Sequence, residues 1–231
     1  MKYIASAAAA LLIAGCGSIG TSRITQTFNF DFDQIRDGWI PGAADYPAAQ
    51  AAAVGAFGAV QALPAPLPAT RMVPYLRGTN VSGDLFLYQK RFFVGLAALS
   101  TYSIQIQLEF ATNYQAGCTA GPGPLTVIKA GLSDVEPLTT TDAQGIVRLN
   151  IDKGAGTAAG DFTQLGDIRN TLGGCPATGT FGLRTVSLQS QPMLLTTDGG
   201  GGFWLFIGTQ SSFTGQHEIY LSGMKLVVQV E

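Results

Sequence analysis

The chain has 231 residues, of which 12% are charged, and its formal net charge is −2 at pH 7. This length can bury a substantial core and is ordinary for one large all-β domain. A weakly charged, slightly acidic chain has no electrostatic means of holding a polyanion, so we expect no nucleic-acid partner. Beyond the first sixteen residues, no apolar run approaches the length of a membrane span.

The first sixteen residues have the order of an export signal. Lys2 supplies a positive start, and residues 4–14 form an apolar run shorter than the roughly 20 residues that span a bilayer. Gly15 and Cys16 close it. This order resembles the lipobox of bacterial lipoproteins, in which the chain is cut before the cysteine and that cysteine carries lipid. The alternative is an ordinary secretory signal with a chance cysteine.

The lipobox resemblance implies an address and a membrane partner. Residues 1–15 would be a signal peptide, Cys16 the lipidated residue, and residues 16–22 a Gly/Ser-rich tether to a single domain over 23–231. Gly17, rather than Asp, resembles lipoproteins sorted to the outer membrane. We therefore expect a lipid-anchored protein of the bacterial cell envelope.

Two early segments of the domain show different patterns. Phe28, Phe30 and Phe32 alternate with polar residues, which predicts a strand with its aromatic rings on one face. Residues 48–63 are alanine-rich and favour a helix, but Gly55 and Gly58 interrupt them. For this second segment both a short helix and an extended edge segment remain open.

From residue 72 onwards the strand signal is strong. Residues 102–110 alternate apolar and polar side chains without interruption, as in a half-buried strand with Gln105, Gln107 and Glu109 on its polar face. Further strands are expected over residues 72–77, 84–93, 125–130, 146–151, 181–188, 203–208 and 218–230. Short strands at this spacing, with no βαβ alternation, predict an all-β fold, an antiparallel β-sandwich of jelly-roll type.

The cysteine count agrees with export. With Cys16 assigned to lipid, Cys118 and Cys175 remain, and two cysteines in an exported chain most often form a disulfide. The alternative is a pair of free thiols. No second Cys or His stands near either residue, so a metal site there is not expected.

Three segments in this order resemble the jelly-roll carbohydrate-binding modules with a galactose-binding-like fold. They are Phe28-x-Phe30-x-Phe32 with Asp37-Gly38-Trp39, Gly95-Leu96 with Tyr102-x-Ile104-x-Ile106, and the final Glu218-Ile219-Tyr220-Leu221. The resemblance implies a jelly roll that binds glycans. Ser222 and Gly223 stand where those modules often carry acidic and amide residues.

One group of loop residues has the composition of a sugar site. Aromatic faces take the apolar side of a sugar ring, and nearby polar groups pair with its hydroxyls. The ligand-binding candidates are Trp39, Tyr46, Tyr75, Arg77, Asn80 and Asp84. Ordinary loop packing is the alternative, and Trp204 between Phe203 and Phe206 is expected to be core.

The sequence gives weaker support for catalysis and for metal binding. His217 is the only histidine, and we expect it to be a surface or packing residue rather than a catalytic base. Glycoside hydrolysis would need two carboxylates across a cleft, such as Glu109 with Asp84 or Asp152. Calcium is a possible cofactor, and the candidate ligands are Asp31, Asp33, Asp152 and Asp161.

The favoured function is therefore a non-catalytic binding module of the envelope, with carbohydrate as the favoured ligand. One alternative is a structural or protein-interaction lipoprotein, and a further one is a glycan-acting hydrolase.

Overall fold

The computed structural model describes residues 25–33, 38–153, 161–188 and 192–231. The predicted signal peptide, the tether and Cys16 lie outside these residues. In the part of the chain that the structure describes, no helix is long and apolar enough to cross a membrane.

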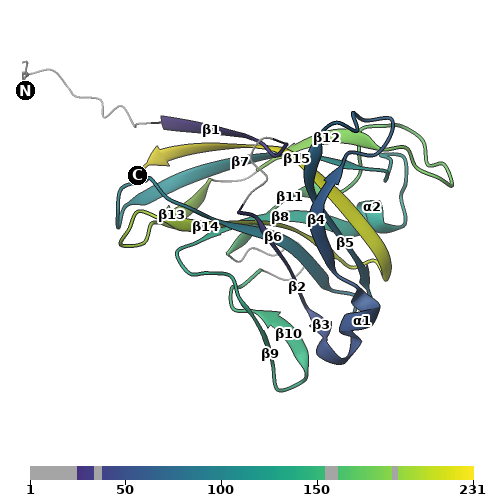
Figure 1. The fold of residues 1–231 in the computed structure, drawn as a ribbon, viewed down its shortest axis with the longest axis horizontal. Helices are drawn as coiled ribbons and strands as arrows, with labels where there is room; N and C mark the ends of the chain where they lie inside the picture. Colours follow the sequence, from purple (N-terminus) through teal and green to yellow (C-terminus); the bar gives the residue numbers. More distant parts are fainter. Residues whose placement is uncertain (1–24, 34–37, 154–160, 189–191) are drawn as a thin grey trace, which may run out of the picture.

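The larger of the two main sheets has seven strands. Its order is β12-β7-β15-β5-β4, with β1 beside β15 and β13 beside β7 (Figure 1). The strands are β1 (Thr25–Asp31), β4 (Phe57–Ala62), β5 (Met72–Asn80), β7 (Thr101–Thr112), β12 (Gly182–Ser187), β13 (Met193–Thr196) and β15 (Gly215–Val230). The long strand β15 pairs with β5 along its first half and with β1 along its second half.

The second main sheet has five strands in the order β11-β8-β14-β6-β2. These are β2 (Ile40–Ala44), β6 (Leu85–Phe93), β8 (Thr126–Ser133), β11 (Phe162–Asp167) and β14 (Phe203–Ser211). A small third sheet joins β3 (Tyr46–Pro47), β10 (Ile146–Leu149) and β9 (Thr139–Thr141). The pairings among the described strands are antiparallel, which confirms the predicted all-β antiparallel sandwich.

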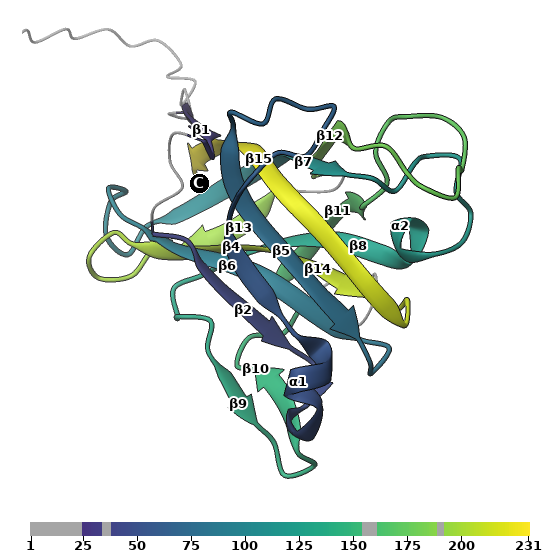
Figure 2. The same cartoon turned by 45° about the vertical axis from the view of Figure 1, so that its right-hand side comes forward.

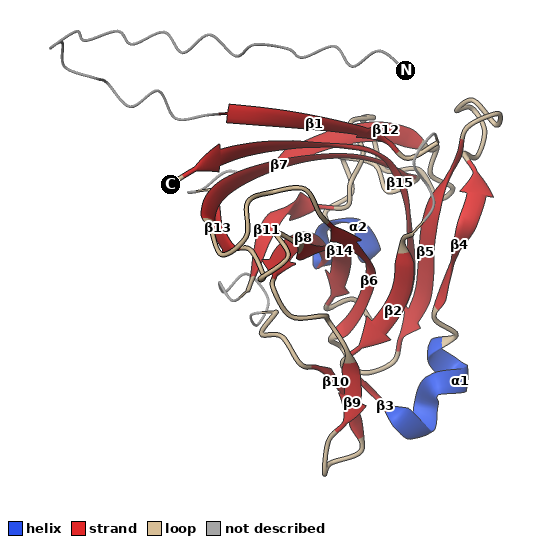
Figure 3. Ribbon diagram, turned by 60° about the vertical axis from the view of Figure 1, so that its left-hand side comes forward, coloured by secondary structure: helices blue, strands red, loops and turns tan. Residues whose placement is uncertain are grey.

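The core lies between the two main sheets, and the seven-stranded sheet curves around the five-stranded one (Figure 3). On β7, Ile104, Ile106, Leu108 and Phe110 are buried, whereas Gln105 and Gln107 are exposed. Burying a large apolar side chain stabilises a fold by about 1.5–3 kcal/mol. The predicted alternation of residues 102–110 therefore sets the inner and outer faces of this sheet.

A second apolar cluster covers the outer face of the five-stranded sheet. Phe86, Phe162 and Phe206 pack there under Ile151, which follows β10. The ring of Phe206 lies over Gly131, where any Cβ would clash with it. Trp204, which the sequence predicts to be core, packs against this cluster. Because both faces of β14 are covered along its first half, residues 203–207 are apolar without interruption.

The segment over residues 48–63 contains both of the structures that its sequence left open. A 3-10 turn (Ala48–Gln50) leads into the short helix α1 (Ala51–Val54), which ends at Gly55 in a left-handed conformation with φ of 51°. Strand β4 follows and pairs with β5, and β4, β5 and β15 lie side by side (Figure 2). Glycine tolerates this left-handed position, and so it allows the helix to end and the strand to begin.

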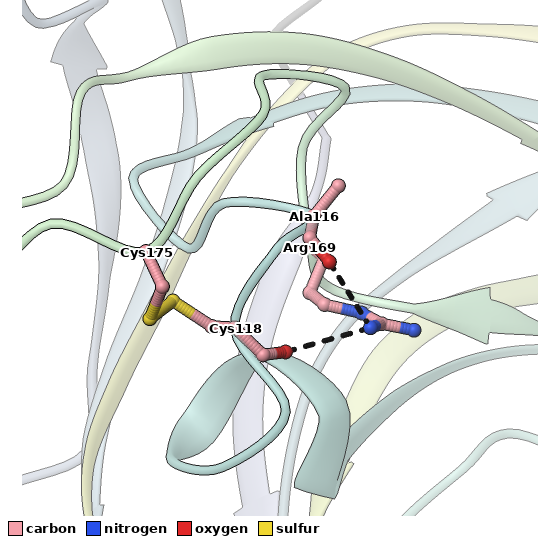
Figure 4. Close-up of a disulfide and its surroundings, with 4 residues drawn as sticks. All are labelled: Ala116, Cys118, Arg169 and Cys175. Atoms are coloured by element: carbon pink, nitrogen blue, oxygen red, sulfur yellow. Dashed lines mark hydrogen bonds between the residues drawn. A yellow bond between two sulfur atoms is a disulfide. The ribbon is translucent and has the colours of Figure 1, made fainter.

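Cys118 and Cys175 form the predicted disulfide, with a Cα–Cα distance of 4.8 Å (Figure 4). It links the loop before α2 (Pro122–Leu125) to the loop before β12. Beside it, the guanidinium of Arg169 donates to the carbonyl oxygens of Ala116 and Cys118. The bridge therefore holds two long loops at one end of the sandwich.

Candidate functional site

Two of the six predicted ligand residues, Trp39 and Asn80, make contacts that stabilise the fold. The ring of Trp39 meets Phe32 edge-on at 5.2 Å and packs against the core. Asn80 is fully buried, and its amide nitrogen donates to the carbonyl oxygens of Ser211 and Phe213. Its amide oxygen accepts from backbone groups of the turn that follows β5. Asn80 thus holds a turn together, with its polar atoms turned away from solvent.

Tyr75 and Arg77 do lie together, on the outer face of the seven-stranded sheet. The Tyr75 hydroxyl donates to Glu218 Oε2 at 2.5 Å, and its ring lies 4.5 Å from that of Tyr220. Burial, together with the hydrogen bond to Glu218, raises the pKa of Tyr75 well above its usual value. Arg77 lies over the ring of Phe57 at 5.6 Å. Tyr75 is only 4% exposed, so its ring offers little face to a ligand.

Asp84 and Tyr46 line two different hollows. Asp84 faces Lys153 at 3.4 Å and accepts from Gln210, beside a hollow of about 420 Å³. In the same hollow, buried Asp45 pairs with Lys153 at 3.0 Å. Tyr46 lines a separate hollow between β2 and β4. The six candidates therefore do not converge on one concave site.

The calcium candidates are engaged with protein groups. Asp31 pairs with Arg71 at 3.1 Å, and Asp33 accepts from the backbone N–H of Met72. Asp152 and Asp161 are joined by hydrogen bonds from the backbone N–H of each to an oxygen of the other. Within the described ranges, no three acidic, histidine or cysteine side chains form a group that could hold a metal. Calcium binding stays an untested prediction.

The carboxylates considered for hydrolysis are also not brought together. Glu109 points from β7 to the outer face of the seven-stranded sheet. Asp84 and Asp152 lie beside the hollow on the other side of the sandwich. Neither residue can share a cleft with Glu109.

The outer face of the seven-stranded sheet carries a different and more coherent site. A β-bulge in β15, between Leu221 and Gly223, shifts its register against β7 and leaves Ser222 as an extra residue. Beside the bulge lies an open hollow of about 320 Å³ between β1, β7 and β15. We call this hollow the polar groove. Its polar side chains are Asn29, Asp31, Arg71, Gln107, Glu109, Thr185, Ser222 and Lys225.

Arg71 organises the centre of the polar groove. Its Nη2 donates to Asp31 Oδ1 and to the backbone oxygen of Ser222, both at 3.1 Å, and its Nη1 lies 3.8 Å from Glu109 Oε1. The Ser222 hydroxyl donates to the same carboxylate oxygen at 2.7 Å. These contacts fix one cation and two carboxylates in a single arrangement that remains partly exposed to solvent.

The groove continues along β7 and β15 into a smaller hollow of about 130 Å³. Gln107 and Lys225 line both hollows, and Gln105 and Ser187 extend the second. The Gln107 amide donates to the Ser187 hydroxyl at 3.2 Å. The result is a strip of amide, hydroxyl and charged groups across the sheet face.

Sequence reasoning found only part of this groove. The alternation along β7 placed Gln105, Gln107 and Glu109 on a polar face, and Asp31 was considered as a calcium ligand. Arg71 was missed, because it lies 40 residues from Asp31 and 38 residues from Glu109 along the chain. Only the pairing of β1 and β7 with β15 brings the three together.

We compared the chain with known proteins. No family model and no curated protein matches it. Among solved structures, it is similar to a carbohydrate-binding module that recognises mannan, with TM-score 0.37, 8% identity, and coverage of 90% of this chain and 98% of that one. It is also similar to carbohydrate-binding modules of the β-sandwich superfamily, with TM-score 0.36, 14% identity, and coverage of 80% and 55%.

A third similar structure is the enzymatically active domain of a tailspike protein of bacteriophage CBA120. Its TM-score is 0.36 and its identity 12%, over 82% of this chain and 19% of that one. This chain thus spans a small part of the tailspike and about half of the superfamily modules. Likenesses of this degree carry no argument about what the chain binds. The β-sandwich itself follows from the strand pairings described above.

Proposed function

We propose that this chain is a non-catalytic carbohydrate-binding protein of the bacterial cell envelope, anchored by lipid at Cys16. The polar groove on the seven-stranded sheet is its binding site. The alternatives are a protein-interaction lipoprotein and a glycan-acting hydrolase.

The observation that supports carbohydrate most is the polar lining of the groove. A sugar presents adjacent hydroxyls, each both donor and acceptor, and these must be paired when a protein covers them. Amides, hydroxyls, a guanidinium and carboxylates line the groove, and Arg71, Glu109 and Ser222 already hold one another in place. Groups fixed before binding lose little conformational freedom when the ligand arrives.

The length of the strip favours a chain of sugars over a single small ligand. The groove and the smaller hollow share Gln107 and Lys225, so a ligand can run from one to the other along β7. Phe30, the aromatic residue among the described lining, packs its ring against Phe93 and the core, and we therefore expect recognition through hydroxyls rather than through stacking.

The same contacts argue against hydrolysis. A glycosidase needs two carboxyl groups that face the scissile bond from opposite sides of a cleft. Asp31 and Glu109 instead face the same guanidinium, and their side chains are 53% and 37% exposed. Both act as acceptors that hold Arg71 in place.

The lipid anchor is tested separately by metabolic labelling with a radioactive fatty acid. We expect label on the wild-type chain and none on Cys16→Ser, because the thiol of Cys16 is the proposed attachment point. Equal labelling of the two proteins would contradict the lipobox interpretation.

The binding function is tested by screening the full chain against a glycan array, followed by affinity electrophoresis with the glycans that bind. We expect retention by at least one polysaccharide. Absence of binding to any glycan, together with co-purification of an envelope protein complex, would favour the protein-interaction alternative.

A further inference from the structure

One end of the sandwich carries an unusual concentration of exposed apolar side chains. The three most exposed large hydrophobic residues among those described are Leu99, Val94 and Leu194, at 75%, 72% and 69%. Val94 and Leu99 lie in the loop between β6 and β7, and Leu194 lies in β13 beside β7. We call these three side chains the apolar tip. Strand β13 and the start of β7, which flank it, lie at the left of the molecule in Figure 1.

The backbone of this loop is already hydrogen-bonded within the protein. The N–H groups of Leu96 and Leu99 donate to carbonyl oxygens of the neighbouring loop between β13 and β14. Thr197 Oγ1 donates to the oxygen of Ala97 at 2.6 Å, and the N–H of Ala97 donates to the Tyr102 hydroxyl at 3.0 Å. A segment that enters lipid must satisfy its backbone groups internally, and these bonds do so for part of this loop.

Leu99 also has an unusual backbone conformation for an exposed leucine. Its φ is 49°, in the left-handed region that a branched residue rarely adopts. Leucine is therefore unfavourable here for the backbone, and its side chain gains no burial in exchange. Such an arrangement at an exposed site points to a use outside the folded domain.

Charged residues are scarce around the tip. No charged residue occurs between Arg91 and Glu109, which includes the whole loop and most of β7. Asp198 and Glu231 lie at this end, but Asp198 Oδ1 is turned towards the backbone N–H groups of Gly200 and Gly202. The loop between β6 and β7 therefore carries no charged side chain, and the charges nearest to it are those of Asp198 and Glu231.

The start of the described chain lies at the same end. Thr25 pairs with Gln229, and the adjoining Val230 pairs with Tyr102 at the base of the tip loop. Cys16 precedes Thr25 by nine residues, which reach at most about 30 Å when extended. A lipid at Cys16 would therefore hold this end of the sandwich, and not the opposite one, close to the bilayer.

We propose that the apolar tip docks onto the surface of the lipid bilayer, with Val94, Leu99 and Leu194 inserted among the lipids. The proposal rests on the lipid anchor at Cys16 and is independent of carbohydrate binding. Docking would orient the sandwich on its end, so that the polar groove on the sheet face stays in water.

The test uses the full lipidated chain in vesicles of phosphatidylethanolamine and phosphatidylglycerol that contain a nitroxide-labelled lipid as quencher. A fluorophore is attached at Ala98→Cys, on the exposed tip loop, or at Thr214→Cys, in the exposed turn at the opposite end. The native cysteines do not react, because one carries lipid and two form the disulfide. We expect quenching of the Ala98→Cys label only.

The matched variants separate the tip from general hydrophobicity. Val94→Ser, Leu99→Ser and Leu194→Ser together should abolish quenching at Ala98→Cys while the protein still floats with the vesicles. Three other exposed residues, changed as Val60→Ser, Leu125→Ser and Leu172→Ser, should leave quenching unchanged.

The outcomes distinguish docking from anchoring. A protein that floats with its Ala98→Cys label unquenched, or that keeps quenching in the tip variant, would overturn docking and leave the anchor intact. A protein that does not float would overturn both. Neither result bears on the glycan screen.

Discussion

At the scale of single residues, His217 shows how burial determines chemistry. It is fully buried in β15, its Nε2 lies 3.2 Å from Thr209 Oγ1, and its Nδ1 has no hydrogen-bond partner in the described part of the chain. Burial lowers the pKa of His217 to about 4. Of the two roles expected for His217, surface residue or packing residue, its burial shows the second.

This histidine predicts a pH dependence of stability. The unfolded chain takes up a proton near pH 6.5, whereas the folded chain does so only near pH 4, so stability is complete above 6.5 and falls as the pH decreases. Between pH 7 and pH 5 the loss should be about 2 kcal/mol, measured by urea denaturation.

The control for this prediction is His217→Gln, which removes the only histidine of the chain. We expect the variant to be less stable at pH 7 but nearly independent of pH between 7 and 5. Parallel pH profiles for the two proteins would show that another group is responsible.

At the scale of elements, the sequence predicted strands best where one face is buried and the other is wet. Strand β7 is such a case, since its alternation marks both faces. Strand β2 was not predicted, and β4 was left open between a helix and an extended segment, because alanine, glycine and, in β2, proline carry little strand preference.

The disulfide gives a prediction at the same scale. Cys118 and Cys175 are separated by 57 positions, and closing a loop of that length stabilises a fold by up to about 4 kcal/mol. We expect a loss of this order in Cys118→Ser/Cys175→Ser, measured as the free energy of unfolding in guanidinium chloride. A double variant as stable as the wild type would mean that the two loops are held by other contacts, such as those of Arg169.

At the scale of the whole molecule, the sandwich carries its polar groove and its apolar tip on different parts of its surface. The outer face of the seven-stranded sheet carries the polar groove, and one end carries the apolar tip. The fold class and the disulfide could be predicted from the sequence. The polar groove could not, because it depends on how β15 is aligned with its neighbouring strands. Asp31, Arg71 and Glu109 meet only because β15 pairs with both β1 and β7 and bulges at Ser222.

The predicted ligand residues illustrate the same limit. Trp39, Asn80 and Tyr75 have the right chemistry for sugars, yet the fold uses them in the core, in a turn and in an aromatic cluster. Residue type indicates what a side chain can do, whereas strand pairing decides which side chains can act together.

The most direct test of carbohydrate binding in the polar groove is the affinity of groove variants for a glycan identified by the screen. Arg71→Ala should weaken binding at least tenfold, because a hydrogen bond to a charged group contributes about 1.5–3 kcal/mol. Gln107→Ala, which removes an exposed side chain, should weaken it by up to about tenfold without loss of stability. The matched control is Gln216→Ala, an exposed glutamine of β15 far from the groove, and we expect no change. Wild-type affinity in both groove variants would contradict the account.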